Sequence, residues 1–184
     1  MLNHVAILVP SVHRCAQRLA ALGHHVGEIE AQPADGSKEV YVGPPEAEGA
    51  LLLVEPVGPG PFERAQRKRG FGLHHVAIDV DDPAQYAVEM GKSGWLLHPK
   101  SIAYFALNKT LFLARPGVCT LVEVQAKRAM SGLAQKFVTG VGIRCAPESM
   151  HLVHALGEPE LHAVQGEAAL EICGHPLALD LLSK

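Results

Sequence analysis

The chain opens with the segment Leu2-Asn3-His4-Val5-Ala6-Ile7-Leu8-Val9, and nearly the same segment returns 71 residues later as Leu73-His74-His75-Val76-Ala77-Ile78-Asp79-Val80. Six of the eight positions are identical, and His4 and His75 form one of the matched pairs. Internal repeats determine the architecture of a chain and are therefore interpreted first. This repeat predicts two equivalent modules, each beginning with a strand that carries a histidine.

The alternation of residues within the opening strand assigns a role to each of its faces. Val5, Ile7 and Val9 share one face, and His4 and Ala6 share the other. The branched apolar face is expected to pack against helices. The opposite face offers a ligand atom with space beside it, so it is expected to line a site.

Turn and capping signals predict the same order of elements in both repeats. Each repeated strand precedes a helix, which Ser11 can cap in the first repeat and Asp82-Pro83 can start in the second. The further strands are predicted at residues 39–42, 50–55, 103–108, 110–114 and 119–125. The predicted fold class is therefore α+β, with paired βαβββ modules at residues 1–57 and 73–129. A Gly/Pro-rich linker at 58–72 contains the basic segment Glu63–Arg69, interpreted as a helix.

Residues 130–184 form a third segment with a weaker likeness to the repeats. Val138-Thr139-Gly140-Val141-Gly142-Ile143 echoes the opening strand, with Gly140 where the two histidines stand. A helix at 147–156 and a strand at 168–172 are predicted to follow. We interpret this segment as a degenerate third βαβ-like extension, one strand short, that extends or covers the sheet. An unrelated C-terminal appendage is the alternative.

Composition narrows the class of protein. A chain of 184 residues with 48% hydrophobic and 19% charged residues fits a globular domain with a real core. The net charge of −3 points to neither nucleic acid nor a membrane surface as a partner. The chain has no apolar run of about 18 residues, and a strand begins where a signal peptide would lie. The four cysteines form no CxxC pair, so we expect reduced thiols and a cytoplasmic location.

Three side chains form a candidate metal site. His4 and His75 occupy matched positions, and Glu123 lies on one face of the last predicted strand together with Leu121 and Gln125. Two imidazoles and a carboxylate suit a divalent ion such as cobalt, zinc, nickel or manganese. A single strand histidine is more often a structural residue, but two histidines at matched repeat positions favour ligands of one shared ion.

Four short segments carry a family resemblance over residues 1–127. They are Leu2-Asn3-His4-Val5-Ala6, Gly72-Leu73-His74-His75-Val76-Ala77, Val80-Asp81-Asp82 and Leu121-Val122-Glu123-Val124. In order and spacing they resemble the vicinal-oxygen-chelate superfamily, and within it the methylmalonyl-CoA epimerase family. The resemblance implies an open, curved sheet around one divalent metal, and it implies homodimers as a frequent assembly.

The resemblance implies four metal ligands, and this chain departs from it at the fourth. His4, His75 and Glu123 fall on three of the ligand positions. The family's fourth ligand stands four residues before a proline, and counting back from Pro56 gives Leu52, which cannot bind a metal. Glu55 is the nearest carboxylate, but positions 52 and 55 face opposite sides of a regular strand. Glu55 could serve only if a bulge or register shift reoriented it.

The activity that the resemblance implies is epimerisation of a short acyl-CoA beside its thioester. One carboxylate would remove the α-proton, the metal would stabilise the enolate, and an acid would return a proton on the opposite face. By resemblance, Glu123 and Glu39 are the catalytic carboxylates. The basic residues Arg64, Arg67, Lys68 and Arg69 are candidates for contact with coenzyme A phosphates, with a solvated helix face as the alternative.

Two other kinds of function are compatible with the same residues. One is another metal-dependent member of the superfamily, such as a glyoxalase-type lyase or a ring-cleaving dioxygenase. The other is a non-catalytic binding or resistance protein with a degenerate metal site, which Leu52 and the C-terminal extension favour. In every case the expected partner is a small molecule.

Overall fold

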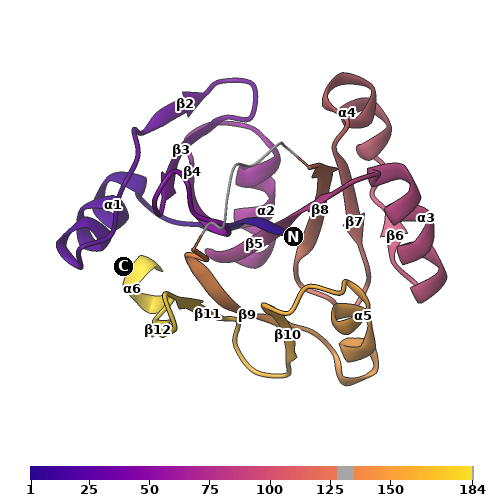
Figure 1. Cartoon of the computed structure of the whole chain (residues 1–184). Coiled ribbons are helices and arrows are strands. Elements are labelled where there is room, and N and C mark those ends of the chain that lie inside the picture. The colour runs from indigo at the N-terminus through magenta and orange to yellow at the C-terminus, as the bar shows by residue number, and fades with distance from the viewer. Residues whose placement is uncertain (128–134, 184) are drawn as a thin grey trace.

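The computed structural model describes residues 1–127 and 135–183, and its largest element is an eight-stranded mixed sheet (Figure 1). The order of strands across the sheet is β2-β3-β4-β1-β5-β8-β7-β6. The first module supplies β1 (Leu2–Leu8), β2 (Glu30–Gln32), β3 (Ser37–Val42) and β4 (Ala50–Pro56). The second supplies β5 (Gly72–Val80), β6 (Leu96–Leu97), β7 (Leu111–Ala114) and β8 (Leu121–Ala126).

The two halves of this sheet are related by a pseudo-twofold axis between β1 and β5. These strands pair antiparallel at the centre, and each pairs in parallel with the last strand of its own module, β4 or β8. Each module thus has its first strand at the centre of the sheet and its second strand at an edge. The paired-module α+β fold predicted from the repeat is confirmed.

Helices cover both faces of the sheet. The helices α1 (Val12–Ala21) and α3 (Pro83–Ser93) pack on the face formed by Val5, Ile7 and their neighbours. Both begin at the predicted caps, since the Ser11 side chain accepts a hydrogen bond from the Arg14 amide and Asp82 caps α3. The basic segment forms α2 (Pro61–Arg69), which packs on the opposite face.

One predicted strand is wrong. Residues 103–108 belong to the helix α4 (Ser101–Asn108), and Leu96–Leu97 forms the edge strand β6 instead. The Ser101 hydroxyl bonds both backbone groups of Phe112 on β7, at 2.9 and 3.0 Å, where a further strand would otherwise pair. The segment after Ser101 is apolar without alternation and contains the strong helix formers Ala103, Ala106 and Leu107, which favours a helix once that edge is satisfied.

The C-terminal extension forms a separate four-stranded sheet in the order β10-β9-β11-β12. Its elements are β9 (Val138–Arg144), a 3-10 turn (Pro147–Ser149), α5 (Met150–Ala155), β10 (Leu161–Val164), β11 (Ala169–Ile172), β12 (His175–Leu177) and α6 (Asp180–Ser183). The expected βαβ order is present in β9, α5 and β10. The extension is not one strand short, however, because it has four strands. Its first strand, β9, pairs in parallel with its second strand, β10, whereas in the two modules the first strand pairs in parallel with the fourth.

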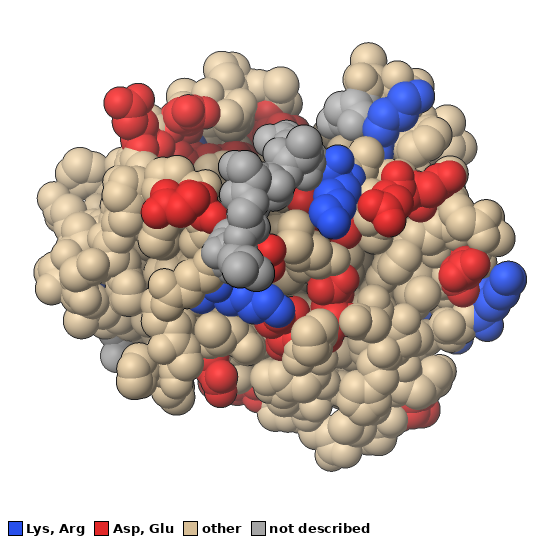
Figure 2. Space-filling model, viewed as in Figure 1, with Lys and Arg blue, Asp and Glu red and all other residues tan. Residues whose placement is uncertain are grey.

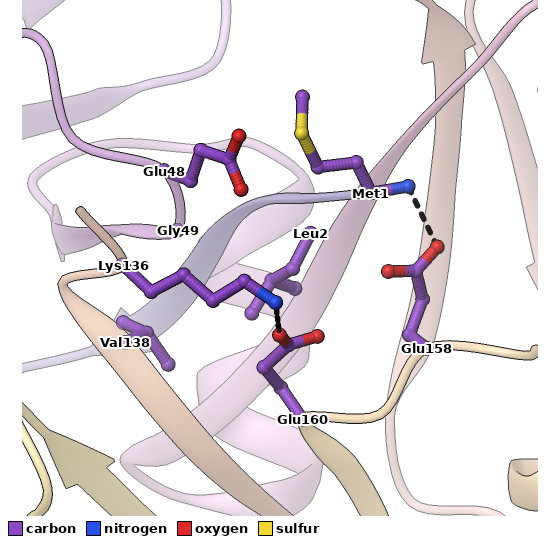
Figure 3. Close-up of a pocket in the computed structure, with 8 residues that line it drawn as sticks. All are labelled: Met1, Leu2, Glu48, Gly49, Lys136, Val138, Glu158 and Glu160. Atoms are coloured by element: carbon purple, nitrogen blue, oxygen red, sulfur yellow. Dashed lines mark hydrogen bonds and ion pairs between the residues drawn. The ribbon is translucent and has the colours of Figure 1, made fainter. Parts of the chain in front are cut away.

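The extension lies on the face of the main sheet that α1 and α3 cover, between these two helices (Figure 1). Figure 3 shows one ion pair that holds it there, because the Met1 ammonium lies 2.6 Å from Glu158. A second pair in the same view, Lys136 with Glu160, lies within the extension. Apolar residues of both sheets belong to one continuous core. The division of the chain at residues 129 and 130 stays a prediction, because that boundary lies outside the described residues.

The charged residues on one face of the molecule are scattered. On the face drawn in Figure 2, acidic and basic side chains occur in small separate groups among uncharged residues. Across residues 1–127 and 135–183, no helix combines the length and the apolar character needed to cross a membrane.

Candidate metal centre

The pseudo-twofold axis brings the predicted metal ligands together. His4 on β1 and His75 on β5 lie on neighbouring strands, each about 5% exposed, and Glu123 lies on the next strand, β8, opposite Ala77. The Nε2 atoms of His4 and His75 are 3.1 Å apart, and His75 Nε2 lies 3.3 Å from Glu123 Oε2. One ligand atom from each of the three residues falls within 4.8 Å of the other two.

These distances fit a single divalent ion. Two donor atoms about 2.1 Å from one ion lie about 3.0–3.4 Å apart when the angle between them is octahedral or tetrahedral. The His4–His75 and His75–Glu123 separations both fall in that range. Two imidazoles and a carboxylate are also a donor set that zinc, cobalt, nickel and manganese accept. The three residues can therefore hold a metal ion, whose identity they do not specify.

The charge state of Glu123 suits a ligand. Burial alone raises the pKa of this carboxyl, but a hydrogen bond from His75 and the proximity of His75 and His4 outweigh it. The pKa of Glu123 therefore lies below its ordinary value. The carboxyl is ionised at neutral pH, as a metal ligand must be.

The sheet register identifies Leu52 as the counterpart of Glu123. Ala6 lies opposite Leu52 on β4, just as Ala77 lies opposite Glu123 on β8. Leu52 is 4% exposed and packs against Ala6, Leu8 and Val54. The fourth position of the symmetric site is thus occupied by an apolar side chain.

Glu55 does not replace the missing ligand. Its Oε2 accepts a hydrogen bond of 2.9 Å from the Val12 amide at the start of α1, on the opposite side of the sheet from His4. The ladder between β1 and β4 is regular from His4 to Leu8, so no bulge reorients the end of β4. The likeness of Leu53-Val54-Glu55 to Leu121-Val122-Glu123 does not reflect the structural equivalence of the two strands.

Glu39 lines the same cleft as the three ligands. It lies on β3 next to Tyr41, which stands opposite Leu52 and contacts the His4 ring edge-on with centroids 5.7 Å apart. The Ser37 hydroxyl donates a 2.8 Å hydrogen bond to the Glu39 carboxyl. Burial raises the pKa of Glu39 above its ordinary value, and the Ser37 hydrogen bond offsets this only in part.

Comparison with known proteins agrees with this geometry. The chain is 28% identical to human mitochondrial methylmalonyl-CoA epimerase over 131 residues, which are 70% of this chain and 73% of the relative. The mouse enzyme is 27% identical over the same length. No family model matches the chain.

Solved structures give the same answer for the fold. Methylmalonyl-CoA epimerase from Mycobacterium tuberculosis superposes with a TM-score of 0.53 at 18% identity, covering 69% of this chain and 88% of the other. An epimerase in complex with methylmalonyl-CoA and ammonium gives 0.53 at 18% identity, covering 72% and 97%. The chain has the vicinal-oxygen-chelate fold. Within that fold it is similar to the methylmalonyl-CoA epimerases.

The three candidate ligands lie in a cleft of about 870 Å³. One wall is apolar, formed by Leu52, Phe62 and Ala65. The cleft is also lined by five cationic side chains: Arg64, Lys68 and Arg69 on α2, together with Lys100 and Arg115. Arg67, the remaining member of the predicted basic run, does not line the cleft and pairs with Glu63 instead.

Several residues around the metal site or in the cleft were not identified from the sequence. Asn3 and His74 each contact one of the metal-site histidines, and each directly precedes it in the repeat, which is the signal that could have found them. Lys100 and Arg115 lie outside any basic run, and only the folded chain brings them to the same cleft as the α2 residues. Burial lowers the pKa of His74 well below its ordinary value, aided by His75 and Arg69, so this histidine is neutral.

Proposed function

We propose that the protein is a metal-dependent epimerase or related isomerase of a short-chain acyl-CoA. The observation that carries this proposal is the joint placement of Glu39 and Glu123 in one cleft with His4 and His75. An α-proton exchange on both faces of a carbon needs two acid–base groups beside one site of charge stabilisation. The similarity to methylmalonyl-CoA epimerases supports methylmalonyl-CoA as the first substrate to test.

The three ligands provide the site of charge stabilisation. A divalent ion held by His4, His75 and Glu123 supplies Lewis-acid stabilisation of the negative charge that develops when the α-proton leaves. The low exposure of both histidines keeps bulk water away from their rings, which strengthens electrostatic interactions in the cleft.

Glu39 acts as the first general base or acid. Burial moves the pKa of this carboxyl toward neutral pH, and a group whose pKa lies nearer the working pH can both accept and return a proton. The Ser37 hydrogen bond fixes the orientation of the carboxyl, and the position of Glu39 on a central part of β3 holds it rigidly. Glu123 acts from β8, in the other module, and its lower pKa makes it the stronger acid of the pair.

The cationic residues of the cleft are proposed to bind the coenzyme A phosphates. Arg64, Lys68 and Arg69 reach the cleft from α2, and Lys100 and Arg115 reach it from the second module. Guanidinium and ammonium groups form the strongest hydrogen bonds with phosphate oxygens. A nucleotide-bearing thioester thus suits this cleft better than a small neutral acid.

Leu52 favours a second candidate function. An apolar residue at the fourth ligand position is also what a non-catalytic binding protein of this fold would carry after its metal site has degenerated. Such a protein would bind a small molecule in the same cleft without proton exchange.

Deuterium incorporation from heavy water into methylmalonyl-CoA tests both candidates. Exchange is expected with the metal-loaded protein, and it is expected to stop with a chelator or in Glu39→Gln. Glu30→Gln is a matched control, because Glu30 lies opposite Glu39 in the β2–β3 ladder and does not line the cleft. Glu39→Gln should retain its metal, which separates loss of the base from loss of the ion.

The result that would overturn the epimerase proposal is equally direct. Absence of exchange in protein that carries one metal ion per chain and binds acyl-CoA favours the binding protein. Exchange that persists after Glu39→Gln and Glu123→Gln together would refute the assigned carboxylates.

A further inference from the structure

Each metal-site histidine lies next to an irregularity in the β1–β5 ladder. On β1, Leu2 pairs with Ile78 and His4 pairs with the next residue of β5, Ala77, so Asn3 has no partner in the ladder and forms a bulge. On β5, His75 pairs with Ala6 and Leu73 pairs with the next residue of β1, Ile7, so His74 forms a second bulge. The two bulges are related by the same pseudo-twofold axis that relates the histidines.

The bulges let the side chain before each histidine contact the histidine ring. In a regular strand the residue before a ligand points to the opposite face, but a bulge removes that alternation locally. As a result the Asn3 side chain reaches the His4 ring, and the His74 ring reaches the His75 ring. Asn3 Oδ1 lies 2.8 Å from His4 Nδ1, and His74 Nδ1 lies 2.8 Å from His75 Nδ1.

The hydrogen bonds of Asn3 determine the tautomer of His4. Asn3 Nδ2 donates to the carboxylate of Asp79 at 3.0 Å, and an ionised carboxylate can only accept. The amide oxygen of Asn3 therefore faces His4, whose Nδ1 must carry the proton. Its Nε2 lone pair is then directed at His75 Nε2 and the centre of the ligand set.

The His74–His75 contact is the counterpart in the second module. A hydrogen bond between two Nδ1 atoms needs one proton and one lone pair. Without an ion, His75 Nε2 can donate to Glu123, but to bind an ion His75 must offer its Nε2 lone pair instead. Its Nδ1 must then carry the proton, and His74 Nδ1 must accept it. His74 is held for this role by the edge-on contact of its ring with Phe62, at a centroid distance of 5.0 Å.

We propose that Asn3 and His74 are matched positioning residues, which hold His4 and His75 in the tautomer and orientation that present Nε2 to a divalent ion. This inference rests on the metal site of the proposed function, but not on its substrate or its catalytic carboxylates. It assigns the same task to two different residue types at equivalent positions. An asparagine should consequently be able to replace His74, whereas an apolar residue should not.

Metal affinity of two substitutions at one position provides the first test. Dissociation constants for Co²⁺ are measured by competition with a chelator in the wild type, His74→Leu and His74→Asn. Loss of an outer hydrogen-bond partner typically weakens metal binding about 10–100-fold, so His74→Leu is expected in that range. His74→Asn retains an acceptor and is expected within about threefold of the wild type. Phe62→Leu loosens the packing on His74 but keeps the Nδ1 contact, so it is expected to weaken Co²⁺ binding less than His74→Leu does.

The tautomers of the wild-type protein provide a second test, which needs no variant to fold. In the Zn²⁺-loaded, ¹⁵N-labelled protein, long-range proton–nitrogen spectra distinguish Nδ1–H from Nε2–H imidazoles. His4 and His75 are expected in the Nδ1–H form and His74 in the Nε2–H form. His74 in the Nδ1–H form would overturn the proposal, because it could not then accept from His75.

The outcomes separate this inference from the function on which it rests. Equal Co²⁺ affinity of His74→Leu and the wild type refutes the positioning role and leaves the metal site intact. No metal binding by the wild type refutes both. Loss of deuterium exchange with metal binding retained affects the proposed function alone.

Discussion

Installing a polar residue at Leu52 should restore the fourth ligand that the symmetry of the sheet calls for. Leu52 occupies the register position equivalent to Glu123, so the side chain of Leu52→Gln would start from the same place relative to β1 as Glu123 does to β5. The amide oxygen is a suitable donor for the same divalent ions. We expect the variant to bind metal more tightly than the wild type.

The substitution also destabilises the metal-free protein, by an amount that the packing of Leu52 determines. Removing a buried leucine from its contacts with Ala6, Leu8 and Val54 costs about 2 kcal/mol. Burying an amide without a partner costs a further ~1–3 kcal/mol. At about 2–4 °C per kcal/mol for a domain of this size, the melting temperature should fall on the order of 10 °C.

Metal should recover part of this loss. Each tenfold gain in metal affinity adds about 1.4 kcal/mol of stabilisation at a fixed excess of metal. Thermal unfolding of Leu52→Gln with and without Co²⁺ should therefore show a larger metal-dependent shift than the wild type does. Leu53→Gln is the matched control, because Leu53 is equally buried but belongs to the core on the opposite face. Equal metal-dependent shifts in the two variants would refute the register argument.

Three further predictions concern residues around the site. Glu55→Ala removes the hydrogen bond to the Val12 amide and should lower the free energy of unfolding in urea by about 1 kcal/mol; a lower metal content would contradict our placement of Glu55. Glu39 has a raised pKa, so its carboxyl binds a proton more tightly in the folded than in the unfolded chain. Stability therefore falls as the pH rises from the unfolded-state pKa of this group through its higher folded-state pKa. Glu39→Gln should thus be more stable than the wild type at pH 7 and equal to it below the unfolded pKa of about 4.3, and the opposite order in urea unfolding would count against the raised pKa. Replacing Lys100 and Arg115 by glutamine should weaken coenzyme A binding, most at low salt, while calorimetric metal affinity stays unchanged; unaltered coenzyme A affinity would remove them from the phosphate site.

The sequence repeat was sufficient to predict the paired modules and the meeting of the two histidines. Two strands that match at six of eight positions, a histidine among them, predict equivalent modules, and the sheet order has this symmetry. The absence of a ligand at position 52 was also readable, because the alternation of β4 excludes Glu55 from the cleft face.

What the sequence did not reveal depends on contacts between distant segments. α4 replaces a predicted strand because the Ser101 hydroxyl, eleven residues from Phe112, fills the edge of β7. The pairing order of the C-terminal sheet is not encoded in the local pattern of any of its strands. The role of Asn3 and His74 depends on two bulges, and a bulge breaks the alternation from which residue faces are read.

The contact of α1 with the C-terminal extension has a consequence for biosynthesis. Cys15 Sγ lies 3.2 Å from the Leu182 carbonyl, and Arg18 donates to the Leu181 carbonyl at 2.6 Å, across separations of 167 and 163 residues. At a synthesis rate of about 5–20 residues per second, α1 leaves the ribosome on the order of 10–30 s before these partners exist. During that interval α1 lacks the contacts of Cys15 and Arg18 with these two carbonyls, so it reaches its final packing only after residues 181 and 182 are made.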